Sequence, residues 1–145
     1  MSPTDLIARC HDHQGHALAG ISLTKSLIET SFDDYDEAAM AAARRVLGET
    51  LRSYQQLKHE RIFDPAIASG HPARADRART MKVACIAAGE EYRQFVLIWT
   101  GVNGHARWAE YRLSTLNLIK RLRDHLDVER EALDELATLN ADGER

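Results

Sequence analysis

The chain has 145 residues, with 19 basic and 22 acidic side chains and a formal net charge of −3. This length suits one domain with a sizeable core, and the balanced charge predicts no nucleic-acid partner and no anionic membrane surface as partner. The longest apolar run, residues 95–99 (FVLIW), is too short to cross a bilayer. The N-terminal residues lack the pattern of a secretory signal, and Cys10 and Cys85 have no CxxC spacing. We therefore expect a cytoplasmic protein with free thiols.

The first predicted helix runs from Pro3 to about Glu29, since proline suits the first turn of a helix. The second helix follows a break at residues 30–37 (TSFDDYDE). Its cap is expected among Ser31, Asp33 and Asp34. Its apolar stripe has one polar member, Lys58, and comprises Met40, Ala43, Leu47, Leu51, Tyr54, Lys58 and Ile62.

The second helix is expected to end near Asp64 and Pro65, followed by a long connection over residues 64–76 (DPAIASGHPARAD). A third helix is predicted from about Arg74 to Trp99, and a fourth from about His105 to Leu139, with a polar tail from about residue 140. Four amphipathic helices in one chain predict an all-α fold. We expect an antiparallel up-down-up-down four-helix bundle that forms a single domain over residues 1–145.

A histidine and a glutamate, His125 and Glu129, lie on the apolar stripe of the fourth predicted helix. The stripe comprises Leu118, Leu122, His125, Glu129, Ala132 and Leu136. A buried carboxylate without a partner would be strongly destabilising. A metal ion is one of the few groups that compensate it well.

Further candidate ligands, His13, His16 and His59, lie near the start of the first helix and the end of the second. An antiparallel bundle would bring these two regions side by side. The predicted metal ligands are His13, His16, His59, His125 and Glu129, with Glu60 and Glu91 as weaker candidates. Imidazole and carboxylate donors suit iron, zinc or manganese. The third helix contributes few donors at this level of the bundle.

Three local patterns resemble the hemerythrin-like (HHE cation-binding) family. They are a histidine near the start of the first helix, YQQLKHERIFDPAI at the end of the second, and HLDVERE in the fourth. The resemblance covers about residues 11–136 and implies non-heme iron, usually two bridged ions, that binds dioxygen, nitric oxide or peroxide. In the second helix this sequence departs from the family pattern at Gln55 and His59, with Glu60 shifted by one position and Asp64 as an extra residue. In the third helix it lacks the histidine pair of the family. The expected cofactor is therefore one or two non-heme iron ions, in a di-iron or an altered site, with zinc as an alternative.

A second interpretation is a metal-free bundle that acts as a regulatory or partner-binding module. In it, Glu129 pairs with Arg93, Arg112 or another base. A carboxylate-bridged oxidase is disfavoured because the third helix lacks the Glu-x-x-His motif, and no nucleotide-binding or hydrolase motif occurs. The sequence thus favours a binding protein over an enzyme. Its expected partner is a small diatomic ligand such as dioxygen or nitric oxide, and a homodimer is left open.

Overall fold

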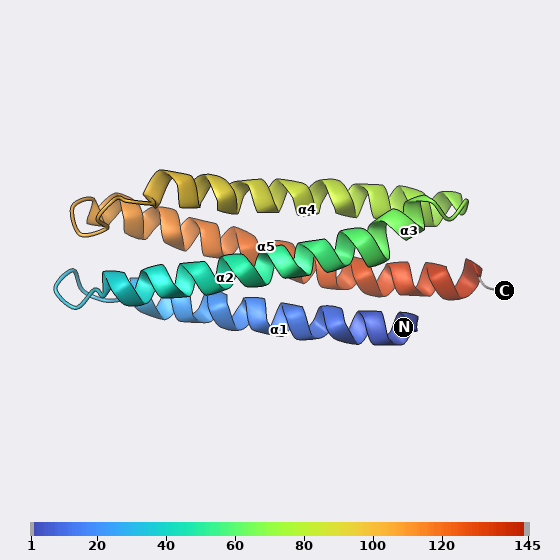
Figure 1. Cartoon of the computed structure of the whole chain (residues 1–145), viewed down its shortest axis with the longest axis horizontal. Helices are drawn as coiled ribbons and strands as arrows, with labels where there is room; N and C mark the ends of the chain where they lie inside the picture. Colours follow the sequence, from blue (N-terminus) through green and yellow to red (C-terminus); the bar gives the residue numbers. More distant parts are fainter. Residues whose placement is uncertain (1, 144–145) are drawn as a thin grey trace.

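The computed structural model describes residues 2–143, and within them the side chains of residue 2 and residues 4–139. The described chain is helical and contains no strand. Four long helices lie lengthwise beside one another as a bundle (Figure 1): α1 (Pro3–Ile28), α2 (Glu37–Lys58), α4 (Pro72–Trp99) and α5 (Trp108–Gly143). A π-helical turn, η1 (His59–Phe63), and a short helix, α3 (Asp64–Ile67), follow α2 directly. No helix in the described part combines the length and apolar character that a bilayer crossing requires.

The N-terminal caps of the first two helices follow from short polar side chains. Ser2, the residue before Pro3, forms a capping box with Asp5 in the first turn of α1. At α2 the Oδ1 atom of Asp36 accepts a hydrogen bond of 3.0 Å from the Ala39 N–H. The predicted caps were wrong here, because Ser31 and Asp34 bond to each other inside the preceding turn.

The prediction that the second helix stops at Pro65 was also wrong. The helix widens instead into η1, where the Asp64 N–H donates to the carbonyl of His59, five residues earlier. Pro65 then falls in the first turn of α3, where its missing N–H is tolerated. The helical path therefore continues to Ile67, and the connection to α4 is much shorter than predicted.

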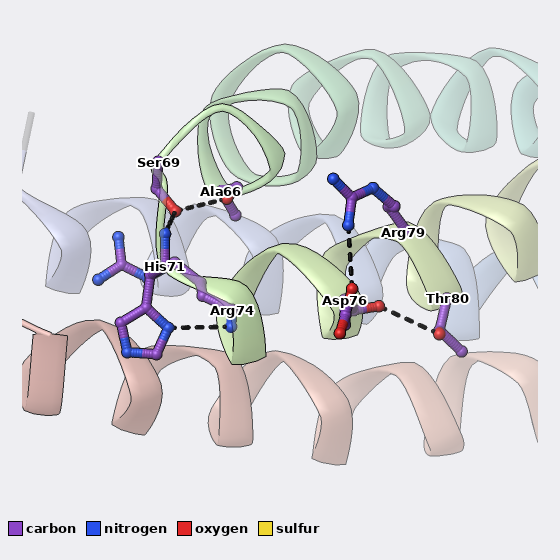
Figure 2. Close-up of polar contacts among 7 residues, drawn as sticks. All are labelled: Ala66, Ser69, His71, Arg74, Asp76, Arg79 and Thr80. Carbon is purple, nitrogen blue, oxygen red and sulfur yellow. Dashed lines mark hydrogen bonds and ion pairs between the residues drawn. The ribbon is translucent and has the colours of Figure 1, made fainter.

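That connection is closed by its own side chains (Figure 2). Ser69 Oγ donates to the Ala66 carbonyl at 2.6 Å and accepts from the His71 N–H at 3.2 Å. The Nδ1 atom of His71 accepts from the Arg74 N–H at 3.2 Å, which makes His71 the N-cap of α4. Gly70 has a φ of 77°, which favours glycine at this turn. The third long helix therefore begins at Pro72, two residues before the expected start.

The fourth long helix also departs from its predicted bounds. It begins at Trp108, after a turn that continues through His105, and it extends to Gly143. The predicted polar tail from about residue 140 falls inside this helix, in the part whose side chains lie outside the described set.

The core divides into two clusters of buried side chains along the bundle. The smaller cluster lies near the α1–α2 and α4–α5 connections and comprises Ile28, Tyr35, Met40, Trp99 and Tyr111. The larger one runs toward α3 and includes Cys10, Tyr54, Phe63, Cys85, Leu122 and Leu133. In Figure 1 those two connections lie at one end of the bundle, and α3, the start of α1 and the end of α5 lie toward the other. The candidate site lies within the larger cluster.

Candidate functional site

A buried ion pair joins α2 to α5. The Lys58 Nζ atom lies 2.8 Å from both carboxylate oxygens of Glu129, and the two side chains are only 4% and 2% exposed. The same Nζ atom lies 3.9 Å from the centroid of the Tyr54 ring, a cation–π contact. The carboxylate that the sequence analysis assigned to a metal therefore has a cation from the chain itself.

Further polar side chains surround this pair. The His125 Nε2 atom lies 3.4 Å from Glu129 Oε2. The Tyr54 hydroxyl accepts a hydrogen bond of 2.8 Å from the Nε2 atom of Gln14, which is buried on α1. Three helices thus contribute to one polar network inside an otherwise apolar core, and Glu129 is at its centre.

The electrostatics keep Glu129 ionised. Burial raises the pKa of its carboxyl group, but His125, whose Nε2 atom lies 3.4 Å away, and the charge of Lys58 lower that pKa by more, so the net pKa lies below its ordinary value. Burial and the Glu129 charge raise the pKa of Tyr54, which therefore keeps its proton. Glu129 consequently carries its negative charge beside the Lys58 side chain.

Both cysteines lie near this network and are buried free thiols. Burial raises the pKa of Cys10 to about 11, with Lys58 opposing the shift. Burial likewise raises the pKa of Cys85, and Lys58 opposes this shift as well. Protonated thiols are poor nucleophiles and poor metal ligands, so these cysteines serve the packing of the core.

The predicted histidine ligands are spread around the network. His13 is half-buried and stacks on the Tyr54 ring, with centroids 5.6 Å apart. His59 is half-buried on η1, beside Phe63, and its buried Nε2 atom has no hydrogen-bond partner among the described residues. His16 is exposed. Of the five main candidates, only His125 and Glu129 are in direct contact.

The weaker candidates lie on the surface and have other partners. Glu60 is exposed and accepts a hydrogen bond of 3.1 Å from Gln56. Glu91 is also exposed, and its Oε1 atom lies 3.2 Å from the Arg121 Nε atom of α5. Neither carboxylate contributes to the buried network.

As arranged, these donors do not fit a bound iron or zinc ion. No group of three or more His, Cys, Asp or Glu side chains is placed to hold a metal within the described residues. Lys58 also holds both oxygens of the carboxylate that would be the principal ligand. The metal site stays a prediction.

Sequence reasoning missed the role of Lys58. The signal was present, because Lys58 is the one charged member of the α2 stripe and Glu129 is the acidic member of the α5 stripe. The bases considered for Glu129 were Arg93 and Arg112, but Arg93 bonds to Glu90 at 2.6 Å on the surface. Two opposite charges on facing core stripes are expected to meet, since neither can be left unpaired.

A cavity of about 180 Å³ borders the ion pair. It lies between α2 and α4, and α5 closes its inner side through Leu122, His125 and Leu126. Lys58 and His125 contribute to its wall, so the polar network has one side facing an unfilled space.

Comparison of the chain with family models, with curated proteins and with solved structures finds no match.

Proposed function

We propose that this chain is a metal-free helical bundle that works as a binding module, with Lys58 in the place of a metal cation. The observation that carries the proposal is the contact of Lys58 Nζ with both Glu129 oxygens at 2.8 Å. We further propose that the bundle is antiparallel, in the up-down-up-down order typical of such domains.

The chemistry of the pair supports this assignment. The ammonium neutralises the carboxylate, and its hydrogen bonds occupy both oxygens. A metal ion that bound at Glu129 would have to displace the buried Lys58 ammonium, which has no other acidic partner among the described residues. Removing one member of a buried pair leaves an uncompensated charge, which is strongly destabilising. The carboxylate of Glu129 therefore favours the Lys58 ammonium over an added metal ion.

The cavity beside the pair supports binding as the role. Its wall contains charged and aromatic side chains as well as aliphatic ones, a mixture typical of ligand pockets. The thiol groups nearby, Cys10 and Cys85, keep their protons and so are not activated nucleophiles. We therefore propose a sensing or regulatory role that depends on whether a ligand occupies the cavity. We propose the cytoplasm as its location, since free thiols are usual there.

The resemblance to hemerythrin-like proteins concerns the arrangement of the helices, which is compatible with this proposal. A bundle of that arrangement in which Lys58 replaces the metal would keep the helices and lose the affinity for iron. Binding of dioxygen, nitric oxide or peroxide through iron stays a prediction, and the same experiment tests it.

The test is the metal content of the untagged protein after reconstitution with ferrous iron, zinc or manganese and removal of unbound ions. We expect less than about a tenth of an equivalent of each metal, because the described residues hold no preformed group of three or more metal ligands. His125→Ala is the matched control, since it removes one candidate ligand and leaves the Lys58–Glu129 pair in place.

Two results separate the interpretations. Close to one equivalent or more of metal in the wild type, lost in His125→Ala, would overturn the metal-free proposal and support the iron-binding one. Metal content that is low and unchanged by His125→Ala supports the proposal.

A further inference from the structure

The cavity beside the ion pair has a long shape set by two facing helices. It extends along α2 from Gly48 to Lys58 and along α4 from Cys85 to Val96. Two glycines, Gly48 on α2 and Gly89 on α4, lie in its wall. A Cβ atom at Gly89 would lie 3.2 Å from Gln55 Oε1, and one at Gly48 would lie 3.3 Å from the Tyr92 ring, so larger residues would crowd this wall.

The size of the cavity limits its occupant. Its volume of about 180 Å³ is close to that of cavities, about 150 Å³, known to hold one benzene ring. Drug-sized ligands need more space than this. The occupant is therefore a molecule of about one ring or an equally short chain.

The walls require an apolar body on that molecule. Aliphatic side chains come from all three helices, namely Leu51, Val96, Leu122 and Leu126. Burying the body of a ligand against them would remove apolar surface from water on both sides.

The charged side chains of the cavity wall favour a negatively charged ligand. No aspartate or glutamate lies among the residues that line the cavity, whereas Arg52, Lys58, Arg93 and His125 do. The charge of Lys58 is already balanced by Glu129. The two arginines are exposed and lie at the rim.

The arginines keep donors for a ligand. Arg93 uses Nη1 for Glu90, which leaves the other guanidinium N–H groups. Arg52 has no acidic partner among the described residues. Arginine binds carboxylates through paired hydrogen bonds, so the rim suits one carboxylate group.

We propose that this cavity binds a small monocarboxylate with an apolar body, its carboxylate at Arg52 and Arg93 and its body between Leu51 and Leu122. The proposal rests on the binding role proposed above and names the ligand class for that role. Binding places one negative charge at the rim and leaves the Lys58–Glu129 pair undisturbed.

The experiment is a titration of the whole ¹⁵N-labelled chain with benzoate, followed by amide chemical shifts. We expect saturable shifts in α2, α4 and α5 around the cavity, with a Kd of about 1 mM or tighter. Ala88→Leu fills the cavity and should abolish these shifts, because Ala88 lines it. Ala87→Leu is the matched control, since Ala87 is the exposed neighbour on the same helix and does not line the cavity.

A separate set of measurements tests whether the cavity prefers a negatively charged ligand. Arg52→Gln and Arg93→Gln should each weaken benzoate binding about tenfold, the loss expected for one charge-assisted contact. Arg123→Gln, an exposed arginine of α5 away from the cavity, should leave the affinity unchanged. Benzyl alcohol, which has a similar shape and no charge, should bind at least about tenfold more weakly than benzoate.

Three results would overturn the ligand assignment: no saturable shifts around the cavity, equal binding of benzyl alcohol, or benzoate binding that survives in Ala88→Leu. The metal assay is independent of this titration. A protein that takes up no metal and no benzoate would therefore refute the ligand class and leave the metal-free function standing.

Discussion

The two ends of the bundle core are stabilised by different physical means. The charged end consists of Gln14, Tyr54, Lys58, His125 and Glu129, and the aromatic end consists of Ile28, Tyr35, Met40, Trp99 and Tyr111. At the aromatic end the Trp99 and Tyr111 rings meet edge to face with centroids 4.9 Å apart. Its polar atoms reach side chains near the surface, as in the hydrogen bond of 2.6 Å from the Tyr35 hydroxyl to Glu37.

This difference determines how each end responds to a substitution. Aromatic packing depends on buried area and shape, so the loss of one polar atom there changes little. The charged end contains an ion pair that is almost fully buried, and each member needs the other. The charged end should therefore be the sensitive part of the core, and its sensitivity should disappear when both charges are removed together.

The largest expected effect is that of Lys58→Met. The variant keeps an apolar side chain of similar length and leaves Glu129 buried without its cation. We expect the free energy of unfolding to fall by about 3–5 kcal/mol, the usual result of breaking a buried pair. Urea denaturation followed by circular dichroism measures it.

The double variant Lys58→Met with Glu129→Leu is the control for that experiment. Replacing a whole buried pair by apolar residues of similar volume is often neutral or stabilising. We expect the double variant to recover most of the lost stability. If it were as unstable as the single variant, packing rather than charge would explain the effect, and the contrast between the two ends would disappear.

Much of the fold could be predicted from the sequence, because long amphipathic stripes are a local signal. The stripe of α2 was identified correctly, since Met40, Ala43, Leu47, Tyr54 and Lys58 are all buried. The boundary at Pro65 could not be predicted from the proline alone, because the π-helical turn η1 changes the hydrogen-bond register just before it. The apparent insertion of Asp64 relative to the hemerythrin-like pattern coincides with this turn.

The candidate site was only partly predictable. His125 and Glu129 were recognised as a pair at helical spacing, and their side chains do meet at 3.4 Å. The partner of Glu129 depends on which helices face each other and at what depth, which is a tertiary property. Lys58 and Glu129 are 71 residues apart, so no local pattern joins them.

Two matched tyrosine variants also compare the two ends of the core, with smaller expected changes in the free energy of unfolding. Tyr54→Phe removes the acceptor of Gln14 Nε2, a buried donor, and we expect a loss of about 1–3 kcal/mol in unfolding free energy. Tyr111→Phe removes the acceptor of Arg44 at 3.2 Å, but Arg44 is partly exposed and can bond to water. We expect about 0.5–1 kcal/mol there. Equal losses in the two denaturation curves would contradict the assignment of sensitivity to the charged end.

The smallest expected effect is a dependence of stability on pH that originates near the charged end. Burial lowers the pKa of His13 and of His59 below the ordinary value of 6.5, with Arg9 and Lys82 respectively adding to the effect. The unfolded chain therefore binds protons more readily at these sites, and their contribution to stability is complete above about pH 6.5 and is lost as the pH falls through the lowered pKa values. Glu129 acts in the same direction below its ordinary value of 4.5, because its pKa is also lowered.

We accordingly expect the Tm to fall by a few degrees between about pH 7.5 and about pH 5.5, before the carboxylate of Glu129 begins to titrate. His59→Gln should flatten this slope, because the buried Nε2 atom of His59 finds no hydrogen-bond partner in the described part of the chain, which favours the neutral ring. His16→Gln is the matched control, since His16 is exposed on α1. A slope that His16→Gln flattens as much as His59→Gln would assign the pH dependence to the surface and would remove this distinction between the two ends of the core.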